Sequence, residues 1–320
     1  MNDNFWSGKR VLVTGGAGFL GSHIVDRLRA AAGCGVAAVR SKEHDLTQME
    51  DCRRCLATHR PHIVIHSAAR HGGLGIQQQQ PGRIFYDNLV MGAHLMEAAR
   101  KAGVAKFVGI GTACSYPGGL DGELAERDFW GAPPHESVLG YGLAKRMMAA
   151  QGVAYKKQYG FDSIHLVLTN LYGPRDDFNP AHSHVVAALI RKFVEARLAG
   201  QPAVEAWGTG KPIREFLYVE DCADAVLLAA ERYDDTAPLN IGTGIGATIR
   251  ELTERVREFS GYRGEVVWDA SKPDGQMKKI FDVSHMKSLL GWQPPTPLRD
   301  GLEKTIRWYE ANKTAADARV

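Results

Sequence analysis

The chain has 320 residues, of which 44% are hydrophobic and 23% charged, and its formal net charge is +3. A chain of this length suits one large domain or two unequal ones, and the small net charge without a basic tract argues against a nucleic-acid partner. No apolar run approaches the ~18 residues of a membrane span, and the first residues lack a signal-peptide pattern. We therefore expect a cytoplasmic protein with no membrane partner.

Five cysteines are an odd number for a long chain, which indicates reduced thiols rather than a disulfide framework. Cys52 and Cys55 have the Cys-x-x-Cys spacing, but no second ligand pair follows at zinc spacing. We interpret them as structural thiols on a helix and expect no metal site.

The first predicted element is a buried strand at residues 9–14. It runs into a glycine-rich turn, Gly15-Gly16-Ala17-Gly18-Phe19-Leu20-Gly21, and then into an amphipathic helix at residues 22–32. This order of strand, turn and helix is typical of a dinucleotide-phosphate site. We expect Gly15 to permit the turn, Gly18 to allow close approach of a pyrophosphate, and Gly21 to let the helix pack on the strand.

The second predicted strand, residues 35–39, ends at Arg40 and Lys42, where an NAD site normally offers an acid to the ribose. A cation there can pair with a 2′-phosphate, which favours NADP(H) as the cofactor. The alternative is that both cations are solvated loop residues. Asp45 and Leu46 follow, where a third turn between strand and helix would lie near the adenine.

Strands and helices continue to alternate, with predicted strands at 62–66 and 106–110 and a long helix at 84–102. The small residues Ala68 and Ala69 follow the first of these strands and suit contact with a cofactor. The alternation predicts an α/β fold with a Rossmann-type doubly wound parallel sheet. Ligands of such sheets bind at the carboxyl ends of the strands.

Candidate catalytic groups gather between residues 109 and 145. Thr112 and Cys114 follow a strand, and Tyr141 and Lys145 lie four residues apart on one face of a helix. A free phenol has a pKa of about 10, and an adjacent cation lowers it. Tyr141 with Lys145 is therefore predicted to be an acid/base unit, with Thr112 on the same substrate oxygen. Chance helical spacing and a merely buried cysteine are the alternatives.

The segment Asn170-Leu171-Tyr172-Gly173-Pro174 resembles the end of the sixth strand in extended short-chain dehydrogenase/reductases. Within that superfamily, the stretches 112–117, 177–185, 207–216 and 269–279 resemble the GDP-L-fucose synthase family. The resemblance runs from Arg10 to about Tyr309. It implies an NADPH-dependent enzyme that epimerises C3 and C5 and reduces C4 of a GDP-4-keto-6-deoxy-hexose.

The resemblance also implies a role for each matching residue. Cys114 would be the epimerisation base, His184 the acid, and Tyr141 the proton donor during hydride transfer. His184 alternatively is a surface histidine or a neighbour of a helix cap. The implied cofactor contacts are Gly15, Gly18, Phe19, Leu20, Gly21, Arg40, Asp45, Leu46, Ala68, Ala69, Lys145, Asn170, Leu171 and His184. The implied substrate contacts are Asn170, Asn179, Lys192, Trp207, Arg214 and Lys279, with Arg191 as a further cation for the diphosphate.

Three positions depart from the family pattern. Ala17 stands where an arginine commonly helps to hold the 2′-phosphate, and Thr112 replaces a serine but keeps the hydroxyl. Lys192 replaces an arginine, which keeps the charge and loses the bidentate geometry. The loop at 117–140 also differs, which leaves the sugar preference open.

We expect a cofactor domain of residues 1–171 plus 214–244 and a smaller, discontinuous substrate domain of residues 172–213 plus 245–320. Apolar side chains on two helices predict a homodimer built from both. These side chains are Leu89, Ala93, Met96, Met147, Met148 and Val153.

Two other functions stay open. One is a related GDP-sugar enzyme, either a 4-reductase without epimerisation or a 3,5-epimerase that retains its nicotinamide. The other is a non-catalytic, NADP-sensing protein on the same fold.

Overall fold

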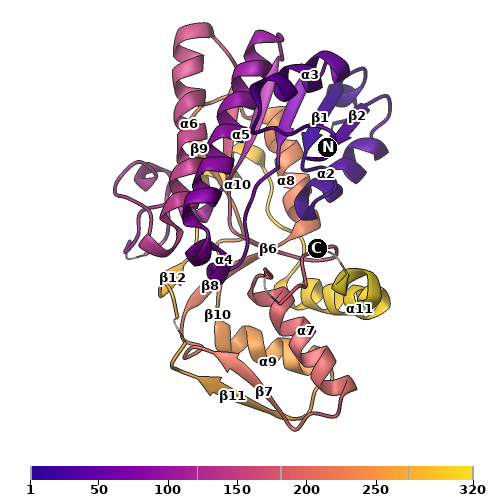
Figure 1. Ribbon diagram of the computed structural model, residues 1–320, viewed down its shortest axis with the longest axis vertical. Helices are drawn as coiled ribbons and strands as arrows, with labels where there is room; N and C mark the ends of the chain where they lie inside the picture. Colours follow the sequence, from indigo (N-terminus) through magenta and orange to yellow (C-terminus); the bar gives the residue numbers. More distant parts are fainter. Residues whose placement is uncertain (1, 121, 181, 273, 319–320) are drawn as a thin grey trace.

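The computed structural model describes residues 2–120, 122–180, 182–272 and 274–318. Figure 1 shows two lobes, a larger one built on a six-stranded sheet and a smaller one that contains α7, α9 and α11. None of the helices in the described residues is long and apolar enough to cross a membrane.

The large sheet has the strand order β2-β1-β3-β4-β5-β9, and every neighbouring pair is parallel. The predicted α/β fold with a parallel, Rossmann-like sheet is confirmed. Its strands are β1 (Arg10–Thr14), β2 (Gly35–Val39), β3 (Ile63–His66), β4 (Lys106–Thr112), β5 (Ser163–Leu168) and β9 (Pro238–Ile241). These strands are mostly apolar because both faces of the sheet are covered by helices.

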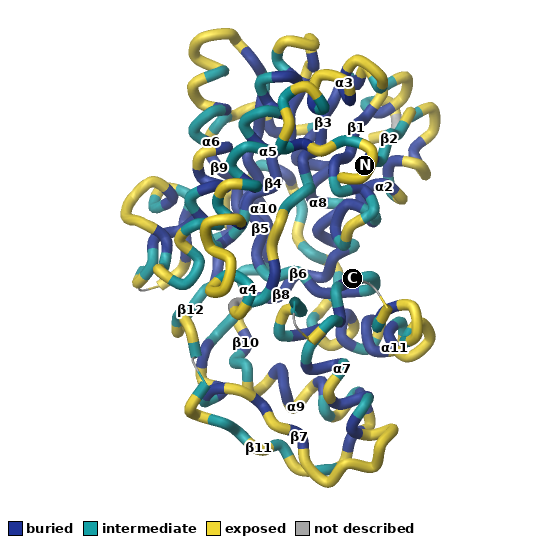
Figure 2. The backbone as a smooth tube through the Cα atoms, in the orientation of Figure 1, coloured by how far each residue is buried: buried dark blue, intermediate teal, exposed yellow. Residues whose placement is uncertain are grey.

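Helices cover the two faces of this sheet. On one face α2 packs against α8, and on the other α3 and α6 both pack against α5. The helices of this lobe are α1 (Asp3–Trp6), α2 (Phe19–Ala30), α3 (Met49–His59), α4 (Leu74–Gln79), α5 (Pro81–Lys101), α6 (Leu139–Tyr159), α8 (Val219–Arg232) and α10 (Ser284–Leu290). Figure 2 shows buried backbone concentrated along the strands between them.

The strand order reverses between β1 and β3, since the chain leaves β1 for β2 on one side and returns to β3 on the other. The carboxyl ends of β1, β3 and β4 therefore meet at one edge of the sheet, where ligands of such folds bind. The glycine turn, Ala68 and Thr112 follow these three ends.

The smaller lobe contains two further sheets. β8 lies between β10 and β12 and also pairs with β6, while β7 pairs with β11. The strands are β6 (Asn170–Tyr172), β7 (Ala203–Trp207), β8 (Ile213–Tyr218), β10 (Gly246–Thr248), β11 (Glu265–Asp269) and β12 (Lys278–Lys279). The helices are α7 (Val185–Leu198), α9 (Ile249–Phe259) and α11 (Leu298–Asp317).

Residues 40–48 form the turns between β2 and α3, and Asp45 and Leu46 lie in them. One local expectation was wrong. Of the side chains expected at a dimer interface, Met96 and Met148 are buried in the core between α3, α5 and α6. The apolar pattern alone did not separate the two faces of these helices.

Candidate active site

The glycine turn is built by close backbone contacts. Gly15 has a φ of +67°, and a Cβ there would lie 2.8 Å from the backbone nitrogen of Ala68. A Cβ on Gly21 would lie 2.1 Å from the carbonyl oxygen of Gly15. Gly18 is the N-cap of α2 and offers no side chain to the first N–H groups of the helix. These groups can hold a phosphate, so the turn fits a dinucleotide.

Arg40 lies exposed after β2, as a residue that meets a 2′-phosphate must. Its backbone N–H donates to the carboxylate of Glu43 at 3.0 Å, an acid that the sequence reading did not consider. Asp45 accepts hydrogen bonds from Thr47, and Leu46 is buried, so neither is free to reorient. In this loop Arg40 and Lys42 are exposed, and so are the acids Glu43 and Asp45, so groups of both signs are open to a ligand.

Small and polar residues line the adjacent strand ends. The backbone N–H of Ala68 donates to the Thr14 hydroxyl at 3.3 Å, which holds the segment after β3 close to β1. The side-chain amide of Asn170 donates to the backbone oxygen of Glu215 at 2.9 Å. This contact joins β6 to β8 and ties the edge of the large sheet to the smaller lobe.

Thr112 and Cys114 lie in the turn after β4. The Thr112 hydroxyl accepts a hydrogen bond from the backbone N–H of Cys114 at 3.2 Å, and both residues are half-buried. Gly142 of α6 packs on this turn, where a Cβ would lie 2.2 Å from the carbonyl oxygen of Cys114. The contact sets α6, and with it Tyr141, directly beside the Cys114 turn.

Tyr141 and Lys145 project from α6 into the same region. Burial lowers the pKa of Lys145 to about 8, and the side chain is only 3% exposed. Burial also raises the pKa of Tyr141, and the negative charge of a Cys114 thiolate raises it further. The expectation that the pKa of Tyr141 is lowered beside Lys145 is therefore wrong, because desolvation of the phenolate dominates.

His184 is the N-cap residue of α7, and its imidazole makes no capping hydrogen bond. It stays exposed, with its ring 5.4 Å from that of His71, which in turn lies 6.4 Å from the Tyr141 ring. Although both residues have an exposed surface, the protein around their imidazoles desolvates them and lowers the pKa of both, which favours neutral imidazoles. A neutral imidazole can accept a proton at neutral pH, and it can pass that proton on once it has taken it up.

His71 is absent from the residues chosen by sequence. It follows Ala68 and Ala69 after β3. Its position at the carboxyl end of a strand was the feature of the sequence that could have marked it as a site residue. The next residues are fixed by backbone contact, since the N–H of Gly73 donates to the carbonyl oxygen of His182 at 2.8 Å. This hydrogen bond joins the loop after β3 to the segment before α7, which brings His71 and His184 together.

Two of the substrate cations are neighbours. In the parallel pairing of β12 with β8, Lys279 lies opposite Arg214, so both side chains leave the sheet on one face. Burial lowers the pKa of Arg214, whereas Cys114 and Asp274 act to raise it. Arg214 is therefore close to the catalytic turn, and a diphosphate beside it would lie close to Cys114.

Trp207 and Lys192 form a second part of the substrate region. Trp207 is 61% exposed at the end of β7, and the Lys192 ammonium lies 5.3 Å from its ring centroid. Lys272 lies 5.5 Å from the same ring. An exposed indole flanked by two cations suits stacking of a nucleobase near a phosphate.

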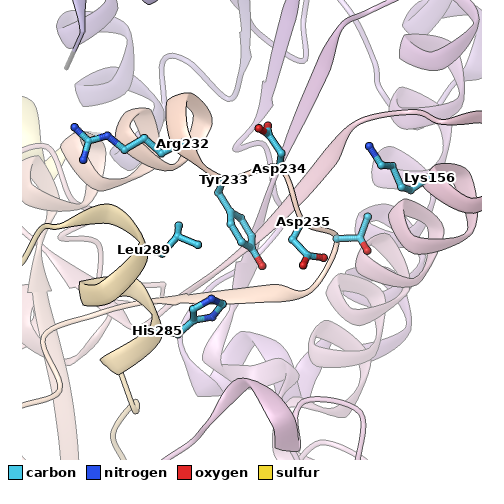
Figure 3. A pocket seen from close by; sticks show the side chains of 8 residues that line it. Lys156, Arg232, Tyr233, Asp234, Asp235, His285 and Leu289 are labelled. Atoms are coloured by element: carbon cyan, nitrogen blue, oxygen red, sulfur yellow. The ribbon is translucent and has the colours of Figure 1, made fainter.

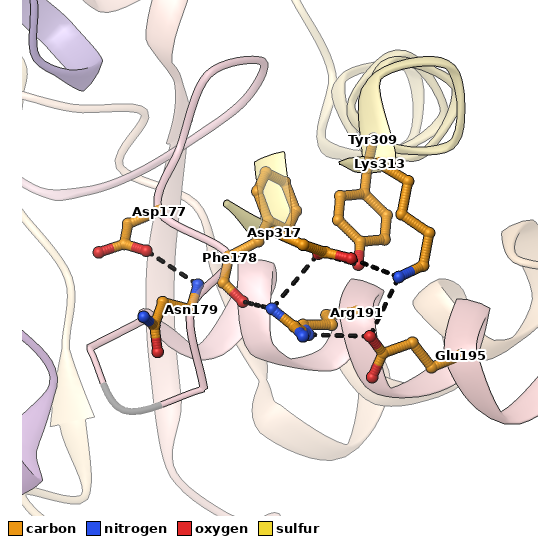
Figure 4. Close-up of polar contacts among 8 residues, drawn as sticks. All are labelled: Asp177, Phe178, Asn179, Arg191, Glu195, Tyr309, Lys313 and Asp317. Carbon is orange, nitrogen blue, oxygen red and sulfur yellow. Dashed lines mark hydrogen bonds and ion pairs between the residues drawn. The ribbon is translucent and has the colours of Figure 1, made fainter. Parts of the chain in front are cut away.

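Arg191 does not join these cations. Figure 4 shows its guanidinium between Glu195 and Asp317, at 3.0 and 3.3 Å, which braces α7 against α11. The expectation that Arg191 serves a diphosphate is wrong, because its charge is already paired. Asn179, in the same view, lies in the loop before α7, where its backbone N–H donates to Asp177 at 2.8 Å.

A surface pocket lies apart from all of these residues. Figure 3 shows it between the ends of α8 and α10, lined by groups such as Lys156, Asp234 and His285. None of the residues predicted to be catalytic or to bind a ligand lines it. The catalytic groups lie instead around the carboxyl ends of β1, β3 and β4.

Comparison with known proteins agrees with this geometry. "Probable GDP-L-fucose synthase 1" of Oryza sativa subsp. japonica is 38% identical over 97% of this chain and 94% of its own. A GDP-6-OMe-4-keto-L-xylo-heptose reductase from C. jejuni superposes with a TM-score of 0.90 at 27% identity, covering 98% of this chain and 99% of that one. A GDP-L-fucose synthetase from Naegleria fowleri bound to NADP superposes with a TM-score of 0.86 at 27% sequence identity, and the match covers 97% of each chain.

The model of one protein family matches residues 11–242, which include the glycine turn, the Thr112 turn, α6 and the strand end at Asn170. The match therefore spans most of the chain, as well as most of the residues that meet at the sheet edge. The chain belongs to the NAD dependent epimerase/dehydratase family.

Proposed function

We propose that the protein is an NADPH-dependent enzyme that epimerises C3 and C5 of a GDP-4-keto-6-deoxy-hexose and reduces C4, as a GDP-L-fucose synthase does. The observation that supports this most is the meeting of two kinds of proton-transfer group. Tyr141 and Lys145 adjoin the Cys114 turn, while His71 bridges toward His184. A reductase that does not epimerise needs only Tyr141 and Lys145.

The proposed chemistry follows from the substrate's ketone. A C4 carbonyl acidifies the protons on C3 and C5, so Cys114 removes a proton from one face and His184 returns one to the other through an enediolate. Bound NADPH supplies the hydride for C4. Tyr141 then protonates the O4 alkoxide, while the Thr112 hydroxyl and the Lys145 ammonium stabilise the charge.

We propose NADP(H) as the cofactor because exposed Arg40 and Lys42 follow β2 where an acid would favour NAD. The N. fowleri relative was solved with NADP. At the other end of the site, we propose that Trp207, Lys192, Arg214 and Lys279 hold the GDP moiety. The alternatives, UDP and dTDP, are separated by comparing their effects on the unfolding temperature.

The proposal is tested with GDP-4-keto-6-deoxy-mannose and NADPH in deuterated water. We expect one NADPH oxidised per sugar, deuterium at C3 and C5, and a GDP-6-deoxy-galactose product with L configuration. Absence of turnover in a folded preparation that binds NADPH would leave the NADP-sensing alternative.

A second candidate is a C4 reductase that does not epimerise. The similarity to the C. jejuni GDP-keto-heptose reductase favours it, because that fold is shared over nearly the whole chain. This candidate predicts NADPH oxidation without deuterium at C3 or C5. A 3,5-epimerase that retains its nicotinamide predicts the reverse, deuterium incorporation without net NADPH oxidation.

We also propose a homodimer formed through α5 and α6. Met147 and Val153 of α6 are 40% and 41% exposed, and Tyr86 of α5 is 60% exposed. These apolar groups lie on the helices that also enclose Met96 and Met148, so one face remains for a second copy. Light scattering should give twice the chain mass at micromolar concentration, and a mass near 35.0 kDa would contradict the dimer.

The two-domain division stays a prediction. A cofactor domain of residues 1–171 plus 214–244 agrees with α8 and β9 packing in the large lobe. β8, which begins this second segment, pairs instead with β6, β10 and β12. We therefore propose β8 as the strand at which the two domains join.

A further inference from the structure

Three soft ligand groups converge outside the catalytic region. One nitrogen of His44, the thiol of Cys55 and one nitrogen of His59 lie within 4.8 Å of one another. Cys55 and His59 are four residues apart on α3, so they share one face of the helix. His44 comes from the turns between β2 and α3. The cluster therefore joins a loop to a helix at the outer end of the large lobe, where Figure 1 places α3.

One ring nitrogen of His44 has no hydrogen-bond partner among the described residues. Its Nδ1 is buried and makes no hydrogen bond among the described residues. An unpaired buried nitrogen costs free energy that a metal bond would offset. The His44 and His59 rings stand 5.9 Å apart and nearly perpendicular, at 79°. Tetrahedral zinc, with bonds of about 2.0–2.3 Å, needs its ligands roughly 3.3–3.6 Å apart, so small side-chain rotations suffice.

We propose that His44, Cys55 and His59 bind one divalent transition-metal ion, with zinc as the best match. A thiolate and two imidazoles suit zinc, whereas magnesium and calcium require oxygen ligands that this trio lacks. Three protein ligands leave a fourth position for water. On binding, the S–H bond of Cys55 breaks, the sulfur bonds to the metal, and the proton passes to solvent.

The second thiol of the Cys-x-x-Cys pair is held apart from the trio. The neighbouring thiol of Cys52 donates instead to the backbone oxygen of Leu46 at 3.4 Å. Cys52 is therefore excluded from the trio, although Cys-x-x-Cys spacing would suggest that the two thiols act as a pair.

A bound ion would fix the turn after β2. The backbone N–H of His44 donates to the carbonyl oxygen of Arg40 at 3.0 Å, so His44 closes the turn that Arg40 begins. Linking His44 to α3 through the metal would join this turn to the helix. None of the three ligands is a residue that we propose to bind substrate or cofactor, and we expect the ion to act mainly on stability.

The test uses full-length protein stripped with a chelator and then titrated with Zn²⁺ and, separately, Co²⁺. We expect one zinc per chain, a raised unfolding temperature and a thiolate-to-cobalt charge-transfer band. Cys55→Ser should abolish the band, and His59→Gln should lower zinc affinity at least about 10-fold. His59 is only half-buried, so this variant remains informative if Cys55→Ser fails to fold.

Cys52→Ser is the matched control, because it removes a buried thiol from the same helix outside the trio. It should keep both the cobalt band and the zinc affinity. Equal zinc affinity in the parent, His59→Gln and Cys52→Ser proteins, or a cobalt band lost with Cys52 and kept without Cys55, would overturn the site.

Discussion

The two halves of the candidate active site differ in how far solvent reaches them. Lys145 is 3% exposed, and burial dominates the pKa of both Lys145 and Tyr141. Tyr141 and Cys114 are both half-buried, so the contrast lies between the buried Lys145 and the exposed His184. Both residues of the first half come from α6, which packs on the sheet, whereas the second half combines a turn after β4 with the start of α7.

The contrast fits the two reactions that we propose. Hydride transfer benefits from a dry site, where the charge on O4 is stabilised by fixed groups. Proton exchange at C3 and C5 requires groups that recover their protons from water between turnovers. The halves touch through the Thr112 hydroxyl, which accepts a hydrogen bond from the Cys114 N–H, and through Gly142, which packs on the Cys114 carbonyl. Their proton-transfer groups come from different elements, so we expect that the halves can be disabled separately.

The largest effect should come from the shared contact. A Cβ at Gly142 would lie 2.2 Å from the carbonyl oxygen of Cys114, so Gly142→Ala must push α6 away from the turn. We expect hydride transfer and deuterium exchange both to fall about 10²-fold or more, with stability lowered by about 1–3 kcal/mol. Gly82→Ala, on α5 with open space around the added Cβ, is the control and should change neither activity.

Tyr141→Phe should separate the halves in one direction. Loss of the phenol removes the proton donor for O4, so NADPH oxidation should fall about 10²–10⁴-fold. Exchange of deuterium into C3 and C5 should continue, since Cys114 and His184 are unchanged. NMR of the sugar alongside NADPH absorbance measures both rates, and equal losses would mean that the phenol also serves epimerisation.

Cys114→Ser should separate them in the other direction. A free thiol has a pKa of about 8.5, whereas a hydroxyl cannot supply a base near neutral pH, so exchange should fall about 10²–10⁴-fold. NADPH should still be oxidised, either by an already epimerised ketone or with a different product. If deuterium exchange continued at the parent rate, the Cys114 thiol would be only a packing group, and the C4 reductase without epimerisation would be favoured.

Arg40→Ala should slow only hydride transfer, because it weakens the binding of NADPH. Removing one charged hydrogen bond to the 2′-phosphate should cost about 1.5–3 kcal/mol of NADPH binding and leave NADH nearly unchanged. Fluorescence titration of both cofactors gives the two dissociation constants. Equal losses for both, or tighter NADH binding by the parent, would reject the NADP assignment.

The smallest expected effect is a pH dependence of stability. Because burial lowers the pKa of Lys145 to about 8 from 10.5, the unfolded chain binds more protons than the folded one between these values. Stability from this group should therefore rise with pH across the window, by at most about 1.4 kcal/mol per pH unit. Lys145→Met should lose this rise in urea unfolding, and an unchanged slope would show that Lys145 is not the buried group.

Local spacing was enough to predict the glycine turn and the common helix of Tyr141 and Lys145. Gly15, Gly18 and Gly21 act on one another within a single turn, and Tyr141 and Lys145 are neighbours by helical geometry. Backbone sterics and helix periodicity operate over a few residues, so their effects can be predicted from the sequence. The parallel sheet was predictable for the same reason, from apolar strands alternating with helices.

Only the tertiary structure decided in which direction burial shifts a pKa and which charges are paired. The upward shift in the pKa of Tyr141 and the ion pairing of Arg191 with Asp317 follow from burial and from a partner 126 residues away. His71 reaches His184 through a loop contact, and His44 reaches Cys55 across the β2 turn. Sequence determined which chemical groups this protein has and their local order; long-range packing decided which of them meet, because burial and charge depend on neighbours far along the chain.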